Sequence, residues 1–416
     1  MEQYQIISLG GSGEDSRNCF YVQAGAERFL LDCGVRRELH IGVKRVYPAL
    51  TREIAQKLTA VFISHAHEDH TAALPYLHEL GYRGPVYGTQ ETLTEVKNFL
   101  QKWVDYIKRG GDTIPFQEEN INALDFRVLT LGEHTFPNFR VRLGRSGHMM
   151  GSVWFHFTFG ERTLLYTGDF TYDGRLLACD QPPHADTVIM ECAYAARQLD
   201  QNAQYDHLLA LAQKTLAAGG KFLLPVPAKG RGIDLLELLS TSGMPIFAEE
   251  SVLKSARSLS RAEAWLRRPL DIQWINVQAV NEENRNAVVN VPRGAIYLFP
   301  DGMMTSPSAL FYYDRFKGGE ANRIVITGHT SKGTVGSMIF QPEYRQENQV
   351  CIQAEQCTVK VHLDCQDALK LSEHLCPKRV MLFHSDCKDC QALSNLLAQR
   401  SIEVFCTPSN SMRCPF

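Results

Sequence analysis

The chain has 416 residues, of which 44% are hydrophobic and 21% are charged, and its formal net charge is −3. This length predicts two or three domains with ample cores, and the small negative charge excludes a global basic field that would attract nucleic acid. The sequence contains no signal-peptide-like start and no run of about 18 consecutive apolar residues. We therefore expect a cytoplasmic protein without a membrane partner.

Three short strands separated by glycine turns are predicted at the start of the chain, over residues 5–9, 20–23 and 28–32. The third strand ends in Asp32, which is followed by Cys33 and Gly34. A carboxylate at the end of an apolar strand is costly to bury unless it accepts hydrogen bonds. We interpret Asp32 as a carboxylate that orients a downstream loop, in preference to a simple turn cap.

The densest chemical signal follows the next predicted strand, residues 60–63. Three histidines and an aspartate lie within six positions, namely His65, His67, Asp69 and His70. A helical apolar pattern continues over residues 71–80, so the cluster is placed between the carboxyl end of a strand and a helix, where α/β folds hold their chemistry. Imidazole and carboxylate groups suit Zn²⁺ and related divalent ions. An exposed polar loop with incidental histidines explains this density poorly.

Two further candidate ligands come from glycine turns beside strands. After a strand at 84–88, a helix at 90–108 and strands at 127–131 and 139–143, His148 stands in the turn before a strand over 153–159. The strand that begins at Thr163 ends in Gly168-Asp169, and an aspartate there is suited to bridging two metal ions. Another apolar strand, residues 187–192, contains Glu191 near its end.

The composition changes after residue 200, where strands and helices alternate. This pattern predicts a separate α/β domain with a largely parallel sheet over residues 204–345. Its turn at Lys229 and Arg231 and its glycine-rich loop at residues 328–336 offer cations and backbone N–H groups to a phosphate. Plain solvated turns are the alternative. The candidate substrate-binding residues are Lys229, Arg231, Ser331, Lys332, Gly333 and Thr334.

Beyond residue 350 the pattern returns to short strands and a helix. A strand over 358–364 is predicted to carry His362, a helix is predicted over 368–375, and a strand over 379–383 leads into His384. Eight of the twelve cysteines lie in the last 66 residues. Cys387-x-x-Cys390 is compatible with half of a structural metal site, but no second such pair accompanies it, so free thiols are the default expectation.

The pattern His65-x-His67-x-Asp69-His70 resembles the metal motif of the metallo-β-lactamase superfamily. Glu191, His362 and His384, the last two 22 positions apart, resemble the three landmarks of its β-CASP branch, which includes the RNase J group and the pre-mRNA 3′-end cleavage endonuclease. The resemblance implies an α/β fold, a metallo-β-lactamase αββα sandwich with an inserted β-CASP α/β cap domain. The expected domains are 1–203 (first part of the metallo-β-lactamase domain), 204–345 (the β-CASP domain) and 346–416 (completion of the first domain).

The same resemblance implies roles for the candidate residues. One metal ion takes His65, His67 and His148, the second takes Asp69, His70 and His384, and Asp169 bridges them. Two Zn²⁺ ions are expected, with Mn²⁺ as the alternative. His362, supported by Glu191, is expected to contact the scissile phosphate or to protonate the leaving oxygen. The expected catalytic residues are Asp69, Asp169, Glu191, His362 and Asp32.

These implications predict a dinuclear metal-dependent phosphodiesterase that cleaves single-stranded RNA, with a homodimer left open. The alternatives are a metallo-β-lactamase-type hydrolase of a small ester or thioester, and a non-catalytic nucleic-acid-binding scaffold. A DNA substrate is disfavoured because DNA-directed relatives typically carry an apolar residue at the position of His384. One departure from the family pattern is His384-Ser385-Asp386, where relatives usually show His-Gly-Glu.

Overall fold

The computed structural model describes residues 4–407 and 413–416, which form two compact units. Unit 1 consists of Met1–Tyr172, Ala178–Gln198 and His362–Phe416, and unit 2 consists of Asp173–Leu177 and Leu199–Val361. The predicted cap domain, residues 204–345, lies within unit 2. No helix among the described residues is long and apolar enough to cross a lipid bilayer.

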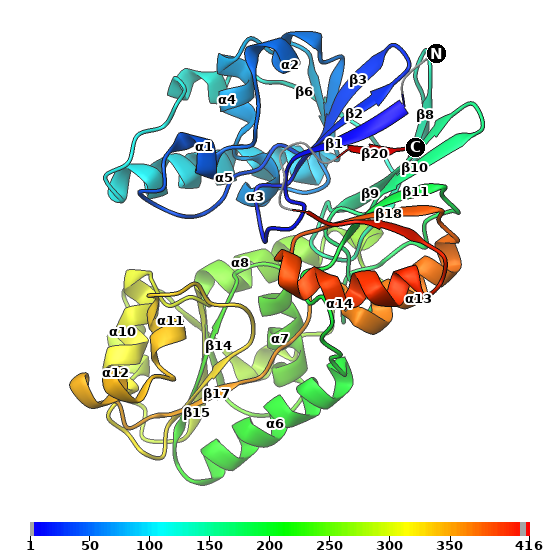
Figure 1. The fold of residues 1–416 in the computed structure, drawn as a ribbon. Coiled ribbons are helices and arrows are strands. Elements are labelled where there is room, and N and C mark those ends of the chain that lie inside the picture. The colour runs from blue at the N-terminus through cyan, green and yellow to red at the C-terminus, as the bar shows by residue number, and fades with distance from the viewer. Residues whose placement is uncertain (1–3, 408–412) are drawn as a thin grey trace. The chain divides into compact units, whose positions relative to one another are not determined.

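Unit 1 contains two seven-stranded sheets. The first sheet has the order β20 (Arg413–Pro415), β1 (Tyr4–Gly10), β2 (Cys19–Ala24), β3 (Glu27–Leu31), β4 (Ala60–Phe62), β5 (Pro85–Gly88) and β6 (Asp125–Val128). The second has the order β19 (Glu403–Phe405), β18 (Arg379–Phe383), β11 (Thr187–Glu191), β10 (Arg162–Tyr166), β9 (Val153–Phe159), β8 (Arg140–Arg145) and β7 (Gly132–Thr135). Strands β1 and β20, from opposite ends of the chain, lie side by side (Figure 1).

The two sheets of unit 1 pack face to face through aromatic side chains. Phe29 of the first sheet stacks on Phe157 of the second with ring centroids 5.0 Å apart, and Phe62 meets Phe157 edge-on at 5.2 Å. Phe20 and Phe383 make a third contact across the sheets, also at 5.2 Å. Such pairs add about 0.5–1.5 kcal/mol each to the free energy of unfolding, beyond the area that they bury.

Helices cover the two outer faces of this sandwich. The first sheet packs on α1 (Val43–Val46), α2 (Arg52–Lys57), α3 (Glu68–Thr71), α4 (Leu74–Glu79), α5 (Gln90–Arg109) and η1 (Glu118–Ile121). The second packs on α13 (Cys365–Leu375) and α14 (Cys387–Ala398), which run beside β18 in Figure 1. In α5 the buried residues Val96, Leu100, Trp103 and Ile107 recur at helical spacing and form the face that packs on the sheet. The predicted αββα sandwich is confirmed.

Unit 2 is built on one six-stranded sheet in which every neighbouring pair is parallel. Its order is β14 (Val277–Val280), β13 (Ile246–Glu249), β15 (Ala295–Pro300), β12 (Lys221–Val226), β16 (Arg323–Ile326) and β17 (Gln353–Gln356). Its helices are α6 (Gln201–Ala217), α7 (Arg231–Ser240), α8 (Glu250–Leu259), η2 (Glu263–Trp265), η3 (Trp274–Asn276), α9 (Arg285–Val288), α10 (Pro307–Phe316), α11 (Val335–Met338) and α12 (Pro342–Glu347). The inserted α/β unit with a parallel sheet, predicted from the alternation of elements, is confirmed.

Two local predictions are wrong. Residues 358–364 form no strand, because their backbone N–H groups bond elsewhere: Lys360 N donates to the Gln201 side chain and Leu363 N donates to Glu191. The helix predicted over 71–80 begins earlier, at Glu68, and consists of two short helices, α3 and α4. Pro75 lies in the first turn of α4, where its missing N–H costs nothing.

Candidate metal centre

The first group of candidate ligands combines the loop after β4 with two other turns of unit 1. The group consists of His65, His67, His148 and Asp169, whose ligand atoms lie within 4.8 Å of one another. His67 Nδ1 lies 3.1 Å from His65 Nε2 and 3.3 Å from His148 Nε2. Asp169 Oδ2 is 3.5 Å from the Nε2 atoms of both His65 and His148. Three imidazole nitrogens and one carboxylate oxygen therefore face a common point.

The second group consists of Asp69, His70 and His384. His384 Nε2 lies 3.2 Å from Asp69 Oδ2, and His70 Nε2 lies 3.5 Å from the same oxygen. Asp169 joins the two groups, because its Oδ1 is 3.3 Å from His70 Nε2 while its Oδ2 faces the first group. The seven residues predicted as metal ligands are thus brought together, in the two sets that the family resemblance implies.

Asp32 lies beneath the second group, directly after β3, and is completely buried. Its Oδ1 accepts a hydrogen bond from Ser64 N at 2.7 Å. Its Oδ2 lies 2.6 Å from His70 Nδ1 and accepts hydrogen bonds from Ser64 Oγ at 2.7 Å and from the Tyr166 hydroxyl at 2.5 Å. Although burial opposes it, the carboxylates of Asp169, Asp69 and Asp32 raise the pKa of His70 well above its usual value. The Asp32 carboxylate orients the ring by holding the proton on Nδ1, which would leave Nε2 to bind a metal ion once its own proton is lost.

Glu191, at the end of β11, connects two of the loops that carry site residues. Its Oε1 accepts hydrogen bonds from Phe170 N at 3.2 Å and Leu363 N at 2.8 Å, and its Oε2 accepts one from Ala193 N at 2.9 Å. The donors Phe170 and Leu363 directly follow Asp169 and His362 in the chain. His362 Nδ1 lies 3.4 Å from Glu191 Oε1 and 3.7 Å from Asp169 Oδ2, so His362 also borders the metal groups.

The electrostatics of the cluster suit a metal ion. Burial alone would raise the pKa of Asp169, but the neighbouring His70 and His384 hold it well below its usual range, so the carboxylate is ionised. Burial, together with the nearby His70, lowers the pKa of His65, which keeps this imidazole neutral. Neutral imidazole and ionised carboxylate are the forms that bind metal ions. Against the effect of burial, the neighbouring carboxylates raise the pKa of His70 well above its usual value and that of His384 to about 9, so metal binding at the second group must displace protons from these two imidazoles.

Buried polar atoms without partners point to the same conclusion. Asp169 Oδ1 and His362 Nδ1 are among the buried side-chain atoms of the described residues that make no hydrogen bond. Leaving such atoms unpaired is costly in a native fold unless a ligand satisfies them. The unpaired oxygen of Asp169 therefore fits a metal centre, and the unpaired nitrogen of His362 borders that centre, where it faces the carboxylates of Glu191 and Asp169.

Sequence reasoning missed Asn18 and Gly34, which both touch the ligand loop. Asn18 Nδ2 lies 2.8 Å from His70 Nε2 and 3.3 Å from Asp69 Oδ2. A Cβ at Gly34 would lie 1.6 Å from the carbonyl oxygen of Asp69, so only glycine allows this close approach. Gly34 directly follows the strand-end Asp32-Cys33 and could have been suspected, whereas an isolated asparagine carries no signal.

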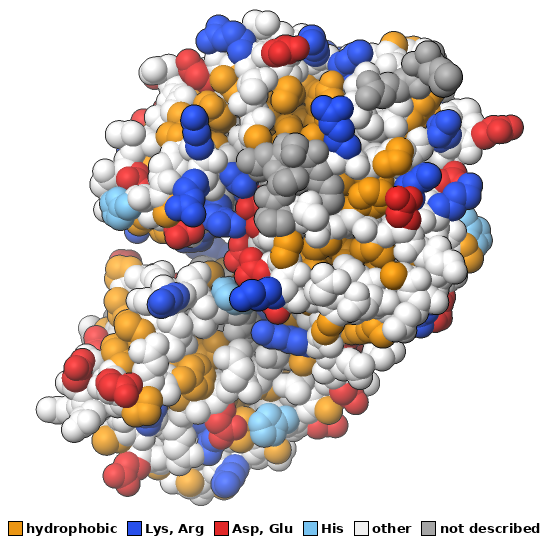
Figure 2. All heavy atoms as spheres, in the orientation of Figure 1, with side chains coloured by type: hydrophobic (Ala, Val, Ile, Leu, Met, Phe, Trp, Pro, Cys, Tyr) orange, Lys and Arg blue, Asp and Glu red, His pale blue; other side chains and the backbone are white. Residues whose placement is uncertain are grey.

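The predicted substrate-binding residues all belong to unit 2. Their turns follow β12 and β16, at the carboxyl edge of the parallel sheet, which is the edge where α/β sheets bind ligands. Arg231 Nη1 donates to Val359 O at 3.2 Å, and the guanidinium occupies the space that a Cβ at Gly328 would fill. In the glycine-rich loop, Lys332 and Gly333 are exposed, and Thr334 N is already bonded to Ser331 O. Figure 2 shows lysine and arginine side chains spread over one face of the protein among acidic and hydrophobic ones.

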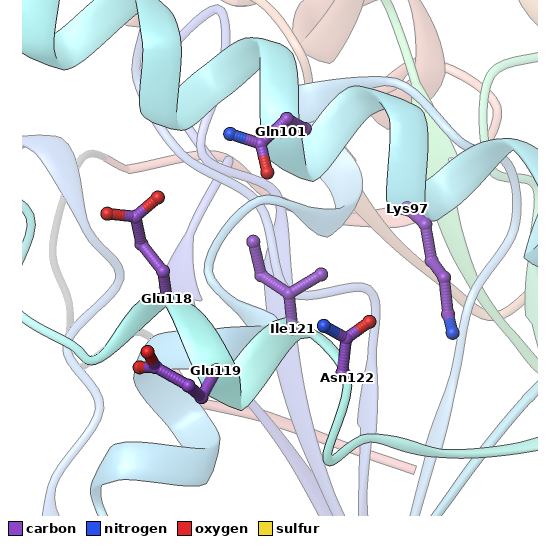
Figure 3. A pocket seen from close by; sticks show the side chains of 6 residues that line it. All are labelled: Lys97, Gln101, Glu118, Glu119, Ile121 and Asn122. Atoms are coloured by element: carbon purple, nitrogen blue, oxygen red, sulfur yellow. The ribbon is translucent and has the colours of Figure 1, made fainter.

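A pocket of about 320 Å³ lies between α5 and η1 in unit 1. Figure 3 shows its lining, which consists of Lys97, Gln101, Glu118, Glu119, Ile121 and Asn122. The lining includes none of the predicted site residues and mixes both signs of charge. The pocket is therefore distinct from the metal centre.

Comparison with known proteins agrees with this geometry. The family model described as "Metallo-beta-lactamase superfamily" matches residues 12–219. A solved structure of a protein of unknown function from Enterococcus faecalis V583 covers 100% of both chains with a TM-score of 0.65 and 14% sequence identity, which supports the fold alone.

Two curated relatives extend the similarity into unit 2. "Transcription termination factor FttA" of Methanothermobacter thermautotrophicus is 30% identical over 368 residues, which are 80% of this chain and 57% of the relative. "Integrator complex subunit 11" of Gallus gallus is 27% identical over 423 residues, covering 92% of this chain and 69% of that protein. The chain thus spans a little over half the length of the FttA relative. The family model matches half of the chain, and the chain also has the inserted α/β unit expected of the β-CASP branch. The chain therefore belongs to the metallo-β-lactamase superfamily.

Proposed function

We propose that the protein is a dinuclear metal-dependent phosphodiesterase that cleaves single-stranded RNA in the cytoplasm. The observation that carries this proposal is the sharing of Asp169 by two ligand groups, with its Oδ2 near His65 and His148 and its Oδ1 near His70. Two Zn²⁺ ions suit this set of imidazoles and carboxylates, and Mn²⁺ is the alternative. Two ions in such a site lower the pKa of water and neutralise charge on a phosphate.

The protein's own residues supply orientation and proton transfer in this proposal. Asp32 fixes the tautomer of His70, and Glu191 holds the loops of Asp169 and His362 in place through backbone hydrogen bonds. The His362 side chain is 15% exposed, whereas Glu191 is fully buried. With Nδ1 directed at Glu191, His362 presents Nε2 as the group that protonates the leaving oxygen.

The choice of RNA rests on the relatives and on unit 2. The printed names of the FttA and Integrator relatives concern transcription termination and the Integrator complex. The resemblance of Glu191, His362 and His384 to the β-CASP landmarks favours RNA over a small ester. Exposed Lys332 and the turn of Lys229 lie at the carboxyl edge of the parallel sheet, where a phosphate backbone is expected to bind.

The test uses metal-loaded protein with single-stranded RNA labelled at either the 5′ or the 3′ end, matching DNA, and a chelator control. Chelator-sensitive cleavage of RNA is expected, and Asp69→Ala should abolish it without unfolding the protein. Unchanged turnover in purified Asp69→Ala would refute the mechanism. Lys332→Ala should weaken RNA binding, and the slope of the logarithm of the binding constant against the logarithm of the salt concentration should become shallower by about one. Identical binding curves across salt would remove the Lys332 loop from the RNA site.

A further inference from the structure

Beneath the second metal group, unit 1 contains a row of four cysteine thiols. The Sγ atoms of Cys192 and Cys390 are 3.5 Å apart. The Cys406 side chain neighbours those of Cys390 and Cys387, and Cys387 Sγ donates a weak hydrogen bond to Cys406 O at 4.0 Å. The sequence showed only the Cys387-x-x-Cys390 pair, because Cys192 and Cys406 come from distant segments.

This row differs from a metal-binding cage. A structural zinc site needs four cysteine or histidine ligands around one centre, whereas the contacts here run in sequence from Cys387 through Cys406 and Cys390 to Cys192. Among the described residues, the groups able to converge on one ion include none of these cysteines. The row is also graded in exposure, since Cys387 and Cys406 are partly accessible while Cys390 and Cys192 are buried.

The two buried thiols hold the backbone on both sides of His384. Cys192 Sγ donates to Phe383 O at 3.1 Å, and Cys192 N donates to the same oxygen at 2.9 Å. Cys390 Sγ donates to Ser385 O at 3.5 Å. His384 itself has a left-handed backbone with φ of 69°, a conformation that a residue with a Cβ adopts only when its surroundings enforce it.

We propose that Cys192 and Cys390 form a redox-modification site whose disulfide releases the backbone around His384 and so weakens the second metal group. The inference rests on the proposed function for its consequence on metal binding, but not for the chemistry at sulfur. A disulfide has no S–H group, so its formation removes both thiol hydrogen bonds that flank His384. It also draws together β11 and the start of α14, from which the two cysteines extend.

A hydroperoxide is the class of oxidant that the exposure gradient allows. It converts the partly exposed Cys406 thiol to a sulfenic acid and leaves as an alcohol, or as water from hydrogen peroxide. The Cys390 sulfur then displaces water from the sulfenic acid to form the Cys390–Cys406 disulfide. Attack of the Cys192 sulfur on Cys390 transfers the disulfide to the buried pair and returns Cys406 to a thiol. In total, two thiols lose two hydrogens and one peroxide is reduced.

The neighbouring Cys390 thiol and burial raise the pKa of Cys406, which disfavours the thiolate that attacks the peroxide, so oxidation should be slow at neutral pH and faster at higher pH. The experiment treats the full-length protein with hydrogen peroxide, blocks free thiols by alkylation, and maps disulfides by peptide mass spectrometry. Hydrogen–deuterium exchange of the segment 383–390 and metal affinity by competition with a chelator are measured on the same samples. Cys192→Ser is the matched variant, because its hydroxyl still donates to Phe383 O but cannot form a disulfide.

The expected result is a Cys192–Cys390 disulfide, faster exchange in the segment, and metal affinity lower by roughly 10- to 100-fold, as for loss of groups that support metal ligands. All three effects should be reversed by dithiothreitol and should be absent from Cys192→Ser. Three outcomes would each overturn the proposal. They are a disulfide between Cys390 and Cys406 alone, a Cys192–Cys390 disulfide with unchanged hydrogen–deuterium exchange of the segment 383–390, and thiols that hydrogen peroxide does not oxidise. If the segment responds while the reduced protein binds no metal, the redox site stands and the proposed function fails.

Discussion

Asp32→Asn tests how the second metal group is organised, since it keeps the shape of the side chain and removes its charge. The Ser64 backbone N–H can only donate, so the remaining oxygen of the new amide must stay at the Oδ1 position. The amide nitrogen then faces His70 Nδ1, at the 2.6 Å that separates it from Oδ2 in the unmodified protein. Two donors cannot face each other at this distance, so the proton of His70 moves to Nε2.

A protonated Nε2 cannot bind a metal ion, so His70 is lost as a ligand although it is still present. Loss of such a supporting partner typically lowers metal affinity by roughly 10- to 100-fold, which is about 1.4–2.7 kcal/mol of binding free energy. The assay is competition with a chromophoric chelator, in which the weaker of two binding steps should be selectively affected. Tyr166→Phe is the control, because it removes one donor to Asp32 and leaves the carboxylate intact. Equal metal affinity of Asp32→Asn and the unmodified protein would refute this reasoning.

Three further predictions concern support of the site and the stability of unit 2. Glu191→Gln replaces a carboxylate that accepts three backbone hydrogen bonds, so unfolding free energy should fall by about 1–3 kcal/mol and the rate of RNA cleavage should fall while KM stays unchanged; steady-state kinetics with normal values would contradict this. Gly34→Ala should lower the melting temperature and the metal content, whereas Gly318→Ala, where a Cβ meets nothing within 4 Å, should change neither; equal effects would argue against the close approach. Burial and the Glu237 carboxylate raise the pKa of Asp234 to about 7, so the stability that its protonated form contributes is complete below pH ~4 and is lost as pH rises through about 7. Asp234→Asn should flatten this dependence in urea unfolding measured at pH 5 and pH 8, and a parallel pH response of both proteins would contradict it.

The sequence was most informative where several chemical groups are adjacent in the chain. His65, His67, Asp69 and His70 lie on one loop, so their spacing alone indicated a metal motif. His148 and Asp169 stand beside glycines at strand ends, and the fold brings both to that loop. The parallel sheet of the second unit followed from strand and helix periodicity, which depends on local residues. The αββα sandwich was implied by the resemblance of the histidine and aspartate motifs to the metallo-β-lactamase superfamily.

The missed features depend on contacts between distant segments. Asn18 contacts Asp69 and His70, which lie some fifty residues further along the chain. A single asparagine belongs to no sequence pattern from which such a contact could be predicted. Residues 358–364 have the composition of a strand, yet their N–H groups bond to the side chains of Gln201 and Glu191, which no local pattern reveals. The thiol row likewise required the fold.

The most direct test of the central claim is anomalous diffraction at the zinc absorption edge from crystals of metal-loaded protein. We expect two peaks, one bounded by His65, His67 and His148 and the other by Asp69, His70 and His384, with Asp169 between them. A single peak, or peaks away from Asp169, would contradict the assignment of a dinuclear centre.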